Sequence, residues 1–93
     1  MSNSSLKNRI DIYHQLGKRI VHLRKQRKLS SLDLALDAGV NKNYLSDLEN
    51  GRRNPTLKVL RKIAIALDID LTELFAGIRD YSISKDKNIN LDV

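Results

Sequence analysis

The chain has 93 residues, no cysteine and a net charge of +6. A domain of this size holds one hydrophobic core but no deep catalytic cleft, and without cysteine it has neither disulfides nor thiolate metal sites. No apolar run approaches the length of a membrane span and no secretory signal is visible, so we expect a cytoplasmic, non-enzymatic protein without a cofactor.

The positive charge is unevenly distributed along the chain. Residues 1–30 carry +7 and residues 51–66 carry +5, whereas residues 31–50 and 67–93 carry −3 each. Two basic segments on either side of a near-neutral one suit a protein that binds DNA phosphates around an inserted element. A cationic surface that only faces solvent is the alternative interpretation.

The first predicted helix carries an apolar stripe at helical spacing. Leu16, Ile20 and Leu23 recur at intervals of three and four residues, and basic side chains occupy the rest of the surface. Two positions for the start of this helix remain open, one near Ser5 and one at Asp11.

Two short helices, residues 31–38 and 41–50, are predicted next, with a tight turn between them. Gly39 suits the left-handed backbone that ends the first of these helices, and Asn41 suits the N-cap of the second. Two short helices joined by such a turn are the geometry of a helix-turn-helix.

The outer face of the second of these helices is small and polar, because Leu45 and Leu48 face the core. Such side chains match the hydrogen-bonding groups of base edges in the major groove, and solvated faces usually contain more Lys, Glu and Arg. The predicted base-contacting residues are Lys42, Asn43, Tyr44, Ser46 and Asp47. Asp47 has an alternative role, pairing with a nearby base such as Lys42 or Arg52, because DNA phosphates repel a carboxylate that lacks a donor.

Residues 51–55 are predicted to form a basic loop, because Gly51 stops the preceding helix and Pro55 forbids its continuation. Arginine side chains in such a loop can reach backbone phosphates. Free amides at a helix N-terminus, such as the one that Ser30 caps, also favour a phosphate. The predicted phosphate-contacting residues are Ser30, Ser31, Asn50, Arg52 and Arg53.

Two further helices are predicted in the C-terminal part of the domain. Thr56 suits the N-cap of a fourth helix with an apolar core-facing stripe. Asp70 and Glu73 form a D-x-x-E capping box, which predicts a short fifth helix that ends near Gly77. The predicted core residues of the fourth helix are Leu57, Leu60, Ile63, Ala64 and Leu67.

Residues 16–76 resemble the phage repressor and Cro family of helix-turn-helix proteins, also called XRE-type regulators, which includes restriction-modification controller proteins. The resemblance rests on A-x-x-x-G-V, L-x-x-L, E-N-G-R-R-N-P-T, L-x-x-I-A-x-A-L and L-x-E-L-F in this order. It implies an all-α, five-helix, lambda-repressor-like domain. It also implies a dimeric, sequence-specific repressor or activator that binds a palindromic operator with helix 41–50 in the major groove.

Ser31 departs from the family pattern, whereas Glu49 matches it. Ser31 stands where the family usually has a glutamine that resembles a clamp between a phosphate and the recognition helix, and serine is too short for that role. Glu49 matches a family glutamate that we interpret as structural, pairing with a base such as Arg24 or Arg61.

The short fifth helix has more apolar side chains than it needs for docking, and the family resemblance implies that the subunit interface lies there. The alternative is that these side chains complete the core of the monomer. The predicted interface residues are Leu71, Leu74, Phe75 and Ile78.

Residues 1–79 are predicted to form the DNA-binding domain, and residues 80–93 a C-terminal tail that is an edge strand, disordered or a binding segment for a protein partner. An antitoxin-type interaction module with autoregulatory DNA binding is therefore a second hypothesis. A weaker third one places basic residues 7–28 on an anionic membrane. No metal site is expected, because His14 and His22 lie about 12 Å apart along a helix.

Overall fold

The computed structural model describes residues 11–79, which form α-helices joined by short loops. The helices are α2 (Ile12–Gln26), α3 (Ser31–Ala38), α4 (Lys42–Glu49), α5 (Leu57–Ala66) and α6 (Leu71–Leu74). No residue of this range is in a strand. The predicted all-α fold with five helices is therefore confirmed.

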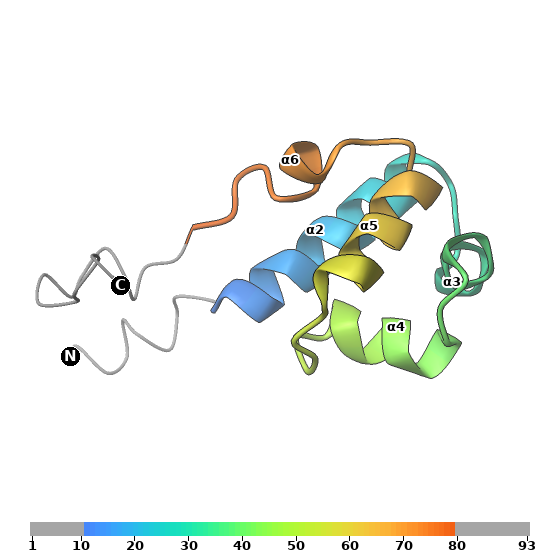
Figure 1. Cartoon of the computed structure of the whole chain (residues 1–93), viewed down its shortest axis with the longest axis horizontal. Helices are drawn as coiled ribbons and strands as arrows, with labels where there is room; N and C mark the ends of the chain where they lie inside the picture. The colour runs from blue at the N-terminus through green and yellow to red at the C-terminus, as the bar shows by residue number, and fades with distance from the viewer. Residues whose placement is uncertain (1–10, 80–93) are drawn as a thin grey trace, which may run out of the picture.

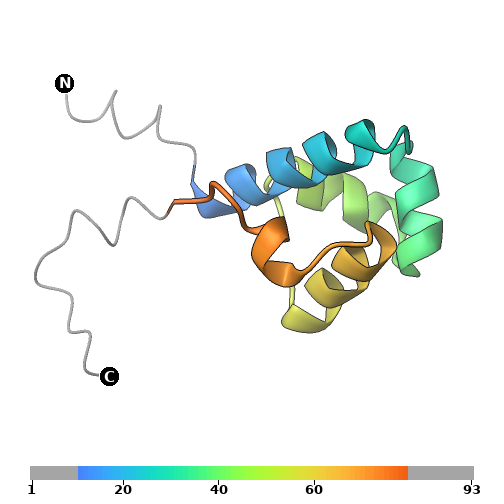
Figure 2. The same cartoon turned by 90° about the horizontal axis from the view of Figure 1, so that it is seen from above.

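The long helix α2 organises the domain. It contacts α3, α4 and α6, while α5 packs against α3 and α6. Figure 1 shows α4 along one edge of the domain and α6 along the opposite edge. In Figure 2, which is turned by 90°, α3 closes one end of the domain and the last described residues leave from the other end. The helices α4 and α6 therefore lie on opposite edges of the domain.

The apolar side chains of the five helices within residues 11–79 meet in one core. The apolar stripes predicted for α2, α4 and α5 are confirmed with one exception, Leu57, which is 66% exposed. Leu57 is the first residue of α5, and the Cα–Cβ bond in a helix tilts towards its N-terminus, so this side chain projects past the helix into solvent. The buried apolar residues are Leu16, Ile20, Leu23, Leu34, Ala35, Ala38, Leu45, Leu48, Leu60, Ile63, Ala64, Leu67 and Leu74.

Side-chain caps fix the starts of the first four described helices. The predicted caps Ser30, Asn41 and Thr56 each accept a hydrogen bond from the backbone amide three residues later. Asp11 does the same for α2, accepting from His14 N at 2.9 Å. The alternative start near Ser5 lies outside the described residues.

The prediction for the last helix is wrong in two respects. Asp70 forms no side-chain cap, and α6 ends at Leu74 instead of near Gly77. The carbonyl oxygen of Glu73 at this end accepts from the Nε and Nη2 atoms of Arg19 at 3.2 and 2.9 Å. Beyond Leu74 the amides of Ala76 and Ile78 donate to the carbonyls three residues back, at 3.1 Å each, so the chain continues as turns instead of as an α-helix.

The last described residue is held against α2. The side-chain amide of Gln15 donates to the carbonyl oxygen of Arg79 at 2.6 Å and accepts from its backbone N–H at 2.8 Å. The predicted tail, residues 80–93, and its expected protein partner lie outside the described residues. Within residues 11–79, every helix is too short or too polar to span a lipid bilayer.

Candidate nucleic-acid interface

The turn between α3 and α4 sets the crossing of these two helices. Gly39 adopts a left-handed conformation with φ of 69°, as predicted. The amides of Gly39 and Val40 donate to the carbonyls of Leu36 and Ala35 at 3.2 and 3.0 Å, the pair of bonds that closes a Schellman motif. The chain therefore leaves α3 in one defined direction, and Asn41 starts α4 two residues later.

The inner face of α4 packs directly on α2. Leu45 and Leu48 are fully buried. Gly17 of α2 lies against the end of α4, and a Cβ atom at this position would be 2.6 Å from the Leu48 carbonyl oxygen and would overlap that of Glu49. The absence of a side chain at Gly17 thus allows the two backbones to approach.

An ion pair between α2 and α4 fixes the same contact. Arg24 donates from Nε and Nη2 to the two carboxylate oxygens of Glu49 at 2.7 and 3.1 Å, and from Nη1 to the Leu29 carbonyl at 3.3 Å. The hydrogen bonds to Glu49 raise the pKa of Arg24, although burial opposes this shift. Arg24 is thus the partner of Glu49, as one of the two sequence alternatives predicted.

The outer face of α4 is polar and accessible. Lys42, Asn43 and Ser46 are exposed, so these three predicted base-contacting side chains lie together on one surface. Asn50 is exposed at the end of the helix, where its Nδ2 atom donates to the Ser46 carbonyl at 2.8 Å. This bond uses one of the two amide hydrogens and leaves the other for a phosphate.

The other two predicted base-contacting residues, Tyr44 and Asp47, are half-buried and associate with the loop arginines. Arg53 donates from Nε and Nη2 to one oxygen of Asp47 at 3.3 and 3.2 Å, and its guanidinium carbon lies 5.1 Å from the centre of the Tyr44 ring. Arg52 is more exposed, and its Nη1 atom lies 3.9 Å from the second Asp47 oxygen. The predicted pairing of Asp47 with Arg52 is therefore present, but the shorter contact with Arg53 was missed.

The two serines at the start of α3 have different environments. Ser30 and Asp33 form a reciprocal capping box: the Ser30 hydroxyl accepts from Asp33 N at 3.0 Å, and the Asp33 carboxylate accepts from Ser30 N at 3.1 Å. The amide and then the hydroxyl of Ser30 lower the pKa of Asp33. The Ser31 hydroxyl is buried and has no partner within residues 11–79, so only its backbone is available to a phosphate.

The predicted interface residues are not equivalent. Leu74 is fully buried within the chain itself, which removes its side chain from any subunit contact. Leu71 and Ile78 are partly buried against the core, and Phe75 is 37% exposed. The apolar surface of this region therefore comes from Phe75, with contributions from Leu71 and Ile78.

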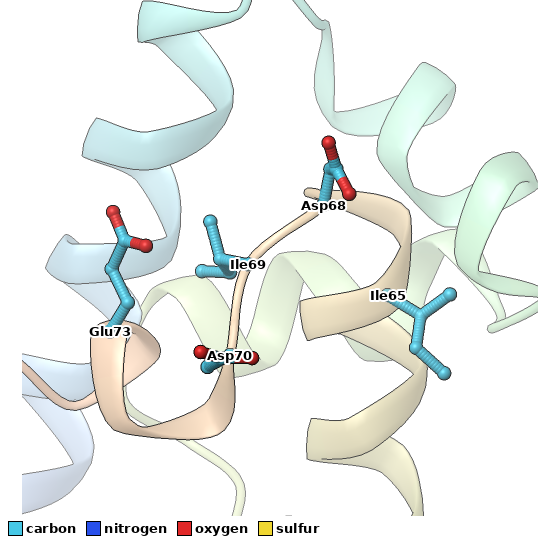
Figure 3. A pocket seen from close by; sticks show the side chains of 5 residues that line it. All are labelled: Ile65, Asp68, Ile69, Asp70 and Glu73. Atoms are coloured by element: carbon cyan, nitrogen blue, oxygen red, sulfur yellow. The ribbon is translucent and has the colours of Figure 1, made fainter.

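A hollow of about 330 Å³ lies beside this region, where α5 ends and α6 begins. Figure 3 shows its lining side chains: Ile65, Asp68, Ile69, Asp70 and Glu73. The carboxylates make this surface unfavourable for phosphates. No group of three His, Cys, Asp or Glu side chains within residues 11–79 is arranged to hold a metal ion.

Comparisons with known proteins agree with this geometry. The family model HTH_3, described as helix-turn-helix, matches residues 20–74. The HTH-type transcriptional regulator SlrR of Bacillus subtilis is 44% identical over 59 residues, 61% of this chain and 39% of SlrR. The immunity repressor protein of Bacillus phage phi105 is 41% identical over 59 residues, 63% of this chain and 41% of the repressor. The chain thus spans less than half the length of either relative.

One similar solved structure is matched by this chain over nearly its whole length. The restriction-modification controller protein C.AhdI from Aeromonas hydrophila superposes with a TM-score of 0.67 at 38% identity, over 68% of this chain and 96% of C.AhdI. The chain therefore belongs to the helix-turn-helix family HTH_3, the DNA-binding domain of XRE-type transcriptional regulators, as its sequence resemblance predicted.

Proposed function

We propose that the chain is a sequence-specific transcriptional regulator that inserts α4 into the major groove of DNA. The observation that carries this proposal is the division of α4 into two faces. Leu45 and Leu48 are buried in the core, while Lys42, Asn43 and Ser46 are exposed on the other side. Amide, ammonium and hydroxyl groups can form hydrogen bonds with the base edges of the major groove.

The strength of DNA binding would come from the segment that follows α4. Residues 51–66 carry +5, whereas residues 31–50, which include α3 and α4, carry −3. Each Lys or Arg that neutralises a phosphate releases condensed counterions, which makes affinity fall as salt rises. Arg52, with its mostly exposed side chain, is our leading phosphate-contacting residue, together with Asn50 and the N-terminus of α3.

We further propose that two copies of the chain bind a palindromic operator. Phe75, Leu71 and Ile78 form the proposed interface, since Leu74 belongs to the core of the single chain. Two α4 helices about 34 Å apart would meet successive major grooves on one side of the duplex. The symmetry of the operator would then follow from that of the protein.

Selection of bound duplexes from a random DNA pool tests the reading of DNA sequence. We expect a palindromic consensus whose affinity exceeds that for random duplex by about 10³ or more at physiological salt. Titration at two salt concentrations should show affinity for both duplexes falling as salt rises. The same affinity for selected and random duplexes would show that the protein binds DNA without sequence preference.

Sedimentation equilibrium of the full chain tests the proposed interface. Phe75→Glu should shift the protein towards monomer, because a carboxylate at a buried subunit contact is strongly unfavourable. The matched control is Leu36→Glu, which places the same charge on a 71% exposed apolar residue of α3. A dimer that survives Phe75→Glu but is lost with Leu36→Glu would move the interface to α3.

A further inference from the structure

The loop arginine Arg53 is held in one orientation by two side chains of α4. Its Nε and Nη2 atoms donate to the same Asp47 oxygen at 3.3 and 3.2 Å, and its guanidinium lies over the Tyr44 ring at 5.1 Å. One contact fixes an edge of the planar group and the other fixes a face. An arginine that only neutralised a phosphate would need neither constraint.

Backbone geometry brings Arg53 to this position. Gly51 adopts a left-handed conformation with φ of 75°, and its amide donates to the Leu48 carbonyl at 3.1 Å. The amide of Arg52 donates to the Asp47 carbonyl at 2.9 Å. The chain therefore turns back along the last turn of α4 and places Arg53 beside the outer face of that helix.

The contacts of Arg53 leave one edge of its guanidinium accessible. Asp47 occupies the edge formed by Nε and Nη2, and Nη1 makes no hydrogen bond to any of the described residues. The side chain is 49% exposed. Nη1 and the second hydrogen of Nη2 form a pair of parallel donors, the pattern that matches O6 and N7 of guanine.

We propose that Arg53 contacts a guanine in the operator and that Asp47 and Tyr44 are the positioning residues that orient it. This proposal rests on the proposed function and deepens it, since it assigns one base of the operator to one side chain. It replaces two predictions from the sequence, a base contact by Asp47 and a phosphate contact by Arg53. It also explains why a carboxylate is tolerated beside DNA: two arginines lie within 4.0 Å of it and offset its charge.

The test uses the full chain and the duplex selected from a random pool by the wild-type protein, together with duplexes in which each G·C pair is replaced in turn. Arg53→Ala should reduce the preference for one G·C pair of each half-site by about tenfold. Asp47→Ala should reduce the preference for the same pair. The double variant should lose no more than Arg53→Ala alone, because the two residues act through one contact.

Conservative variants distinguish a lost orientation of Arg53 from a general loss of the folded structure. Asp47→Asn keeps an oxygen acceptor and Tyr44→Phe keeps the aromatic face, so both should retain most of the preference for this pair, whereas Tyr44→Leu should lose it. The matched control is Arg52→Ala, which removes the same charge from the same loop. It should weaken binding to every duplex alike and lower the salt dependence. Thermal unfolding of each variant checks that it is folded.

Distinct outcomes would overturn the proposal. Equal weakening on all duplexes by Arg53→Ala would make Arg53 a phosphate contact. Loss of preference at a different base pair in Asp47→Ala would make Asp47 itself a base contact. Both results leave the proposed function intact, whereas failure of the wild-type protein to select any sequence overturns that function and the assignment of Arg53 with it.

Discussion

Arg24 and Glu49 form a two-point ion pair that joins α2 to the end of α4, with side chains only 14% and 8% exposed. Both carboxylate oxygens accept from the guanidinium, and the Leu29 carbonyl accepts from its remaining nitrogen. The pair therefore fixes α4 relative to the longest helix and to the loop before α3. A charge left unpaired in this position would be poorly hydrated.

Glu49→Gln should destabilise the fold by about 3 kcal/mol, because it leaves the guanidinium of Arg24 without its counter-ion in a mostly buried site. The measurement is the free energy of unfolding in urea. Asp47→Asn is a matched control, since the same chemical change at a partly exposed ion pair should cost about 0.5 kcal/mol. Equal losses in the two variants would contradict a special role for the buried pair.

The two adjacent serines at the start of α3 should differ in how alanine changes stability. Ser30→Ala removes an N-cap and should cost about 1 kcal/mol of unfolding free energy. Ser31→Ala removes a buried hydroxyl that has no partner in the described part of the chain, so stability should be unchanged or higher by up to about 1 kcal/mol. Urea unfolding of both variants measures the difference. A cost at Ser31 as large as that at Ser30 would show that its hydroxyl is hydrogen-bonded in solution.

Acid should weaken the start of α3 through Asp33. Hydrogen bonds from Ser30 lower the pKa of Asp33 in the folded state. The stabilisation is therefore complete above the unfolded-state pKa of about 3.9 and is lost as pH falls through the lower folded-state value. Asp33→Asn should accordingly lose less thermal stability than the wild type between pH 7 and pH 3. Identical losses of thermal stability in both proteins would show that Asp33 does not contribute to the pH dependence. Asp11, whose pKa is lowered by hydrogen bonds from His14, accounts for part of the loss that remains in Asp33→Asn.

Glycine-to-alanine substitutions should separate steric overlap from backbone strain. Gly17→Ala would normally favour a helix by about 1 kcal/mol, but here the new methyl group meets backbone carbonyls of α4, and we expect a net loss of about 2 kcal/mol. Gly39 has φ of 69° and open space around its Cα, so Gly39→Ala should cost about 1 kcal/mol from the left-handed conformation alone. Thermal unfolding checks both values. A stabilised Gly17→Ala variant would show that α2 and α4 can separate without cost.

Local signals in the sequence predicted much of this fold correctly. Helix caps and tight turns depend on residues within about one helical turn, so a short stretch of sequence is enough to predict them. This holds for the caps at Ser30, Asn41 and Thr56 and for the turn at Gly39. The apolar stripes are legible for the same reason. The prediction that Glu49 pairs with a base came instead from the resemblance to a known family.

Other features of the structure depend on contacts that the pattern within a single helix does not show. The Glu73 carbonyl near the end of α6 binds Arg19, which is 54 residues away in sequence. The need for glycine at position 17 depends on the end of α4, and the orientation of Arg53 depends on a turn that folds back on Asp47. Periodicity within one helix contains no information about such contacts, so only the three-dimensional arrangement reveals them.

The division of α4 into a buried and an exposed face has an evolutionary consequence. Leu45, Leu48 and Glu49 carry the packing and the ion pair, whereas Lys42 and Asn43 project into solvent without supporting the core. Substitutions at the exposed positions are therefore expected to change stability little while changing which operator is preferred. If α4 reads DNA as proposed, single exchanges at these positions would give new DNA specificities on an unchanged scaffold, and a library restricted to them should yield mostly folded proteins.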